Sequence, residues 1–314
     1  SRAPSSTQHA DLLLNLASLY CDRQRYGEAL HFYAAAKAVY KASSGTATAH
    51  YASLLHSMGA CYARQGLHSE ASGLFAEAKA AHDALDAGKT PEYAELLQSM
   101  GARCIAQGRH EEAMEHFATA RAAFEATGAA KTRQYAALLL NMGTCQYALG
   151  HKEEAMEAYH QAKAAFEASG SVLSAGYGDV LRNMGVCYSC RQCPLEAARV
   201  YVQAKEVYEA IGKAFTIEYA GVLQEMGDVY SGQGLHTEAT SIYGIAKSTY
   251  EALGEGSSSR YAGLLQNLGA SLTHQGRHAE ASQLYAAAKA IYEASGSAST
   301  PAYAGLLRNL GGSL

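Results

Sequence analysis

The sequence contains no tryptophan and only 4 prolines in 314 residues, and it has no apolar run near the roughly 20 residues that a membrane-spanning helix needs. No hydrophobic signal segment follows the polar first ten residues, so we expect no membrane association and no export. The 25 basic and 29 acidic residues give a net charge of -4, which lacks the basic footprint of a nucleic-acid-binding protein. The 7 cysteines are an odd number without a disulfide framework, which favours reduced thiols and a cytoplasmic location.

A tyrosine followed by a small residue recurs every 42 residues. Its positions are Tyr51, Tyr93, Tyr135, Tyr177, Tyr219, Tyr261 and Tyr303, and one further step back reaches His9. A polar lead-in of residues 1–8 is thus followed by full units at 9–50, 51–92, 93–134, 135–176, 177–218, 219–260 and 261–302, and by a partial unit at 303–314. Because the period never changes, we expect a single array over residues 9–314 without a domain boundary.

Each unit has the pattern of two amphipathic helices. In the second unit, Leu55, Met58 and Tyr62 form one apolar stripe at helical spacing, and Ala71, Phe75 and Ala78 form another. Glycines that allow a sharp turn separate the two helices at Gly66, Gly108, Gly150, Gly234 and Gly276. Hydroxyl residues that can cap the first helix recur at Ser6, Thr48, Thr90, Thr132, Ser174, Thr216, Ser258 and Thr300. The sequence therefore predicts an all-α chain of antiparallel helix pairs.

These residues resemble the tetratricopeptide repeat signature, in which L-x2-L-G-x2-Y is followed by A-x3-F and a small residue. The match runs through Leu55, Met58, Gly59, Tyr62, Ala71, Phe75 and Ala78. The 42-residue length, against the usual 34, is similar to the kinesin light chain type of array. The resemblance implies a right-handed superhelical solenoid whose first helices line a concave groove, and that groove binds a peptide segment or helix of a partner protein.

The resemblance also implies which first-helix residues face a partner, because they lie opposite the apolar stripe. The candidates are Asn15, His56, Arg64, Gln98, Asn141, Tyr147, Arg182, Asn183, Gln224, Asn267, His274 and Asn309, and Ser189, Glu225 and Asp228 lie on the same face. Five asparagines share one register, so their amides can hold an extended peptide backbone. The alternative is that they join neighbouring repeats or face solvent. The first helices contain no lysine, which argues against a lysine-rich carboxylate clamp.

Two other features have structural interpretations. A basic residue recurs once per second helix at Lys37, Lys79, Arg121, Lys163, Lys205, Lys247 and Lys289, and from Lys79 onward an acid follows four residues later. These pairs predict ion pairs on a solvated helix face rather than a cationic track. Cys187, Cys190 and Cys193 have the spacing of metal ligands, but no fourth ligand is evident. We expect buried thiols there and no metal or cofactor.

The function that follows is a non-catalytic scaffold or adaptor for protein partners, as in cargo transport or complex assembly. The sequence has no catalytic nucleophile at a usable spacing from a general base, no phosphate-binding loop and no metalloprotease motif. No catalytic residue is therefore expected. The alternative is an architectural or self-assembling element of a larger complex, cytoskeletal or ciliary. For this alternative, Leu306, Leu307 and Leu310 in the last unit have no second helix to cover them, and self-association through this end is expected.

Overall fold

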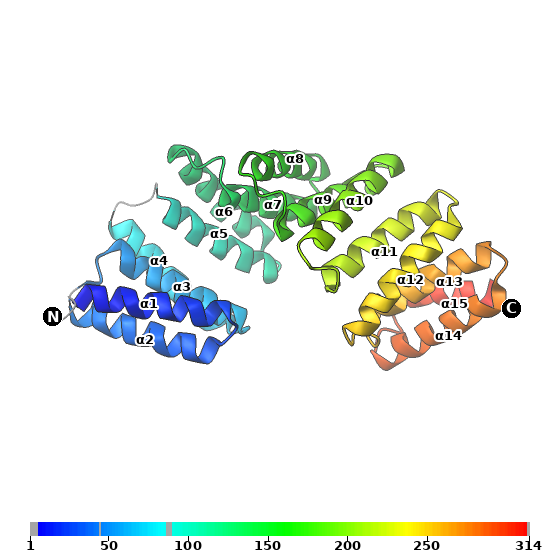
Figure 1. The fold of residues 1–314 in the computed structure, drawn as a ribbon, viewed down its shortest axis with the longest axis horizontal. Helices are drawn as coiled ribbons and strands as arrows, with labels where there is room; N and C mark the ends of the chain where they lie inside the picture. Colours follow the sequence, from blue (N-terminus) through cyan, green and yellow to red (C-terminus); the bar gives the residue numbers. More distant parts are fainter. Residues whose placement is uncertain (1–5, 44, 86–89, 313–314) are drawn as a thin grey trace. The chain divides into compact units, whose positions relative to one another are not determined.

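The structure is a computed structural model, and it describes residues 6–43, 45–85 and 90–312. These residues form α helices and no strand, as the sequence predicts (Figure 1). None of the helices in these ranges combines the length and the hydrophobicity that spanning a bilayer requires. The helices are α1 (Ser6–Asp22), α2 (Tyr26–Ala42), α3 (Ala49–Arg64), α4 (His68–Ala84), α5 (Pro91–Ala106), α6 (His110–Ala126), α7 (Arg133–Ala148), α8 (Lys152–Ala168), α9 (Ala175–Cys190), α10 (Pro194–Ala210), α11 (Ile217–Gly232), α12 (His236–Ala252), α13 (Ser259–His274), α14 (His278–Ala294) and α15 (Pro301–Gly312).

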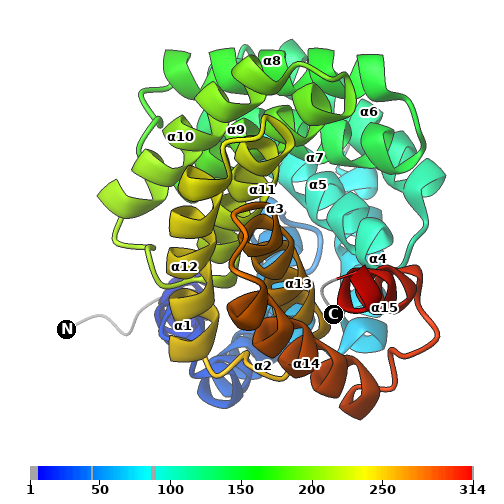
Figure 2. The same cartoon turned by 90° about the vertical axis from the view of Figure 1, so that its right-hand side faces the viewer.

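The helices form two compact units, residues 1–169 with α1–α8 and residues 170–314 with α9–α15. Within each unit, a first helix packs most extensively against the second helix of its own repeat. Inside a unit, a second helix also packs against the first helix of the next repeat of that unit, as α12 does against α13 (Figure 2). The antiparallel helix pairs are therefore confirmed, whereas the single array over residues 9–314 stays a prediction.

The turns inside the helix pairs are set by left-handed backbone conformations. Gly66 has φ of +77° and Gly150 has φ of +87°, which glycine adopts without a steric penalty. In the first and fifth repeats, Gln24 and Gln192 occupy the same register with φ of +60° and +57°. The turn geometry is thus kept even where the glycine is missing.

The predicted caps begin the first helices. The Oγ1 of Thr48 accepts a hydrogen bond from the backbone N–H of Tyr51 at 3.2 Å, and the equivalent bond occurs at Thr90, Thr132, Ser174, Thr216, Ser258 and Thr300. Each bond satisfies a backbone donor that the first helical turn leaves free. Ser6 differs, because it is the first residue of α1 and its side chain lies outside the described residues.

Close approach of paired helices depends on a glycine facing an aromatic ring. A Cβ atom at Gly101 would lie 2.4 Å from Cε1 of Phe117, and one at Gly59 would lie 2.7 Å from Cε1 of Phe75. Phe75 and Phe117 are buried, so their rings have no room to move away. The glycine of the L-G-x2-Y pattern therefore lets α3 and α5 contact α4 and α6 through the rings.

Inside each unit, the repeating tyrosine contacts the repeat before it. Tyr261 of α13 packs edge-to-face on Tyr250 of α12, and its hydroxyl donates to Oε1 of Glu251 at 2.6 Å. Lys247 donates to the same oxygen at 2.7 Å, as the row of basic residues predicts. The i, i+4 ion pairs are confirmed from Lys79 onward, at Lys79, Arg121, Lys163, Lys205, Lys247 and Lys289.

One expectation about the last unit is wrong. Leu306 of α15 is fully buried, whereas Leu307 is 43% exposed. Because α15 packs on both α13 and α14, the preceding repeat covers Leu306 without any following helix. Leu307 is open to solvent, as expected, and Leu310 is half-buried.

Candidate functional site

All twelve predicted partner-facing residues lie on first helices, and none is buried. Asn15, Arg64 and His274 are exposed, and the others are half-buried: His56, Gln98, Asn141, Tyr147, Arg182, Asn183, Gln224, Asn267 and Asn309. The apolar stripe and the polar face are thus separated as the helical period requires. Their role in binding a partner stays a prediction.

Several of these residues contact the neighbouring repeat. His56 of α3 lies 2.8 Å from the Oγ of Ser99 on α5. In α13, Asn267 donates from Nδ2 to Oδ1 of Asp228 on α11, also at 2.8 Å. For Asn267, this contact agrees with the alternative that the amide joins repeats.

Arg64 and His274, two further residues of the predicted set, also contact the preceding repeat. Arg64 of α3 reaches the preceding repeat, where its Nη1 is 3.6 Å from Sγ of Cys21 and 4.0 Å from Oδ1 of Asp22. The ring of His274 stacks on His236 of α12 at a centroid distance of 4.4 Å. Much of the polar face therefore also stabilises the stacking of repeats.

Arg182 has the most extensive of these contacts. From α9 it donates to both carboxylate oxygens of Glu225 on α11, and the Nε to Oε2 distance is 3.1 Å. The two side chains are 32% and 24% exposed, so water screens the pair only in part. The hydrogen bond from Arg182 and its charge fix the position of the Glu225 carboxylate.

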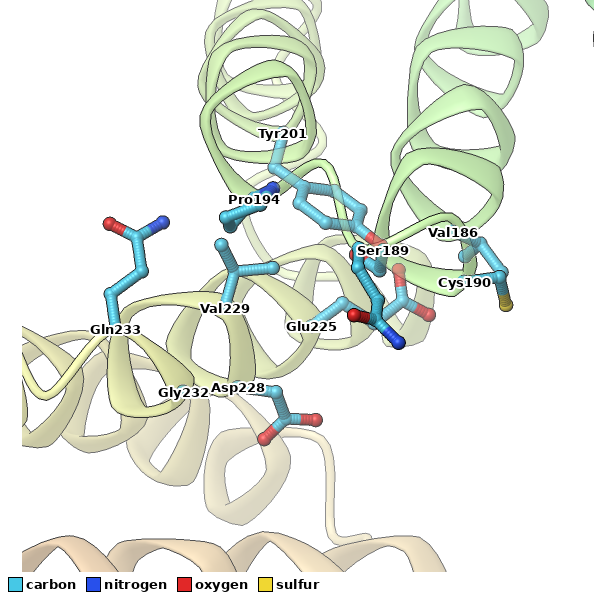
Figure 3. A pocket seen from close by; sticks show the side chains of 11 residues that line it. Val186, Ser189, Cys190, Pro194, Tyr201, Glu225, Asp228, Val229, Gly232 and Gln233 are labelled. Carbon is cyan, nitrogen blue, oxygen red and sulfur yellow. The ribbon is translucent and has the colours of Figure 1, made fainter.

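A pocket of about 580 Å³ lies beside this ion pair, between α9, α10 and α11 (Figure 3). In Figure 3, Tyr201 extends from α10 toward Ser189 at the end of α9, and Val229 and Glu225 lie on α11. The pocket is lined by Val186, Ser189, Cys190, Gln192, Pro194, Tyr201, Glu225, Asp228, Val229, Gly232 and Gln233. It combines an apolar wall of Val186, Pro194 and Val229 with two carboxylates.

Asp228 at this pocket has an unusual environment. Its Oδ1 accepts from the Tyr243 hydroxyl at 2.5 Å and from Asn267 at 2.8 Å, and both donors are neutral. Although part of the residue is exposed, desolvation of the carboxyl group among α11, α12 and α13 raises its pKa to about 6. The two hydrogen bonds partly oppose this rise. The ionised form thus lacks a balancing cation among these contacts.

A second pocket of about 460 Å³ lies on the other side of the ion pair. It is lined by Arg182, Ile217, Glu218, Gly221, Gln224, Glu225, Tyr250 and Arg260. Glu225 lines both pockets, while Arg182 and Gln224 are the members of the predicted twelve that line the second. The second pocket, on α9 and α11, is therefore the cavity that predicted partner-facing residues line.

The first pocket contains none of the predicted twelve residues. Ser189, Glu225 and Asp228 were expected on the same face, but Tyr201 and Pro194 belong to the second helix α10, which the resemblance does not assign to the groove. The sequence signal that could have indicated the site is charge. Glu225 and Asp228 are acids only three residues apart on the partner-facing side of one first helix.

The three cysteines with metal-like spacing, two at the end of α9 and one just before α10, do not form a cluster of ligands among the described residues. Cys187 is buried, as expected, but the expectation of buried thiols is wrong for Cys190, which is exposed, and for Cys193, which is half-buried at the N-cap of α10. In the described parts of the chain, one group of three metal-ligating side chains does converge, and it consists of Cys104, Glu112 and His116 on α5 and α6. The expectation of no metal site remains untested.

Comparisons with known proteins agree with the fold of repeated helix pairs. One profile of the tetratricopeptide repeat matches residues 8–84 and 92–168, and a second matches residues 262–295. No curated protein sequence matches the chain.

Similar solved structures include BtubC (BKLC) from P. vanneervenii, with 17% identity, a TM-score of 0.57, and coverage of 64% of this chain and 80% of that one. Kinesin light chain TPR-like repeats from Podosopora anserina share 15% identity with a TM-score of 0.55, covering 66% of this chain and 98% of theirs. Aspartyl phosphate phosphatase F from Bacillus subtilis shares 13% identity with a TM-score of 0.60, covering 98% and 94%. These likenesses support the fold alone. With the repeat profiles covering more than half of its residues, the chain belongs to the tetratricopeptide repeat family.

Proposed function

We propose that this protein is a non-catalytic interaction module that binds a segment of another protein along α9 and α11, as an adaptor in cargo transport or complex assembly. Asp228 supports this proposal most directly. It lines a pocket with an apolar wall, and its hydrogen-bond donors, Tyr243 and Asn267, are both neutral. A lysine or arginine of a partner would supply the missing cation, and its aliphatic stem would cover Val229 and Val186.

Glu225 influences where in the pocket a cation of the partner would bind. Arg182 already pairs with its carboxylate, so Glu225 carries less uncompensated charge than Asp228. A partner cation is thus drawn to the Asp228 end of the pocket. A basic segment of a partner protein is in keeping with the acidic net charge of -4, and the setting we propose is cytoplasmic.

A random peptide display on the purified chain tests the proposal. Enriched peptides should carry lysine or arginine beside an apolar residue, and Asp228→Asn should weaken their binding about tenfold, because a charge-assisted hydrogen bond is lost. Glu206→Gln is the matched control, since Glu206 is exposed on α10 and does not line the pocket. Peptides without basic residues, or equal affinity for Asp228→Asn, would contradict this assignment.

The same peptides test the predicted asparagine ladder. We expect Asn141→Ala combined with Asn183→Ala to weaken binding of an extended peptide while the melting curve hardly changes. If binding is unaffected, the amides do not hold the peptide backbone. Binding at the pocket around Asp228 is tested separately, by the display experiment.

A specific observation favours self-association as a second function. On α1, Leu12, Leu16 and Leu19 are 57%, 42% and 57% exposed and form one stripe. The equivalent residues of α3, Leu54, Met58 and Cys61, are buried. A second copy of the chain can cover this stripe. The mass in solution should then rise with concentration, and Leu16→Glu should abolish the rise; a constant mass would exclude self-association.

A further inference from the structure

We propose that Cys104, Glu112 and His116 form a binding site for a zinc-class divalent cation between α5 and α6. The Sγ of Cys104, one nitrogen of His116 and one oxygen of Glu112 all lie within 4.8 Å of one another. The His116 Nε2 to Glu112 Oε1 distance is 3.9 Å. Zinc bonds of about 2.3 Å to sulfur and 2.0–2.1 Å to nitrogen or oxygen place tetrahedral ligands about 3.5 Å apart, so the cluster needs only a small contraction.

The repeats of the same chain provide an internal comparison for this site. The register positions of Cys104 and His116 hold two apolar or aromatic residues in most other repeats, namely Tyr20 with Phe32, Tyr62 with Leu74, Tyr188 with Val200, Tyr230 with Ile242 and Leu272 with Leu284. Tyr20 and Phe32 stack at a centroid distance of 5.3 Å. The third repeat therefore replaces a packing pair by two residues that both ligate soft and borderline metals.

The third ligand, Glu112, is not specific to the third repeat. Every full repeat has a glutamate at this position: Glu28, Glu70, Glu112, Glu154, Glu196, Glu238 and Glu280. In the third repeat Arg109 donates to Oε2 of Glu112, which leaves Oε1 on the side of His116. Arg109 thus orients the carboxylate in the way that outer-shell partners orient metal ligands.

Charge and solvent access are compatible with a dication. A Cys104 thiolate and the Glu112 carboxylate together neutralise a divalent ion, so the occupied site would be neutral beside Arg103 and Arg109, and binding would release the thiol proton of Cys104. Cys104 is fully buried while the Glu112 side chain is 43% exposed, so an ion has an entry side and room for a water as fourth ligand.

Titration of the full chain with Zn²⁺ and Co²⁺ tests the site. We expect one ion per chain, a thiolate charge-transfer band with Co²⁺, and affinity lowered at least tenfold in Cys104→Ser, His116→Leu and Glu112→Gln. His116→Leu should fold, because Leu74 and Leu284 occupy this position elsewhere. Cys190→Ser, at an exposed thiol, is the control and should bind as the wild type does.

X-ray absorption of the zinc-loaded wild-type chain provides a second measurement that needs no variant. One sulfur ligand at about 2.3 Å with nitrogen or oxygen ligands supports the site. Two or more sulfur ligands, no saturable binding, or full affinity in the Cys104→Tyr/His116→Leu double variant would overturn it. That double variant reproduces the Tyr62 and Leu74 pair of the second repeat.

Discussion

Arg182 on α9 and Glu225 on α11 lie in consecutive repeats and form an ion pair with an Nε to Oε2 distance of 3.1 Å. The pair separates two pockets on the first-helix face of the second unit, and Glu225 lines both. This contact therefore stabilises the repeat stack and shapes the candidate binding site.

The ion pair should contribute measurably to stability. We expect Arg182→Ala to lower the free energy of unfolding by about 1–3 kcal/mol, because the half-buried Glu225 carboxylate is left without its cation. Urea unfolding measures the change. The double variant Arg182→Ala/Glu225→Ala should lose less than the sum of the single variants, and additive losses would show that the two side chains do not interact.

The paired helices should not tolerate a methyl group at the ring-facing glycines. Gly101→Ala places a Cβ 2.4 Å from the buried Phe117 ring, so we expect a loss of about 1–3 kcal/mol in the free energy of unfolding. Gly73→Ala is the control, because a Cβ there meets no atom within 4 Å and alanine favours the helix by about 0.5–1 kcal/mol. Equal stability of the two variants would refute the close-approach argument.

Stability should fall in acid partly through His56. Burial, with a smaller contribution from the charge of His82, lowers the His56 pKa from 6.5 to about 4. The neutral ring is therefore favoured in the folded state, and its contribution is complete above about pH 6.5 and lost as the pH falls toward 4. Urea unfolding at pH 7 and pH 5 should show a smaller pH dependence for His56→Leu than for the wild type. An unchanged pH dependence would show that His56 is not responsible.

Asp228 should have the opposite pH dependence. Its pKa is raised from 3.8 to about 6, so the protonated form is favoured in the folded state. Its contribution to stability is complete below about pH 4 and is lost as the pH rises through 6. We expect Asp228→Asn to unfold at a higher temperature than the wild type at pH 7, with little difference at pH 4. A lower melting temperature at pH 7 would show that the carboxylate is stabilised by contacts in the free protein.

The candidate site shows where a sequence pattern is sufficient and where it is not. The register placed Arg182, Gln224 and Asn267 on the polar face of their first helices, since burial within a helix follows its period. It did not reveal that Asn267 donates to Asp228, or that Tyr201 of a second helix enters a pocket with Glu225. Those contacts depend on the rotation between successive helix pairs, which the spacing does not contain.

The sequence by itself determined the helix pairs, because caps such as Thr48, left-handed turns such as Gly66 and the spacing of Leu55 and Phe75 act within a few residues of one another. Only the tertiary structure decided which polar side chains meet across repeats. Cys104 and His116 share a site because two antiparallel helices bring them together, and their distance depends on helix packing rather than on local sequence.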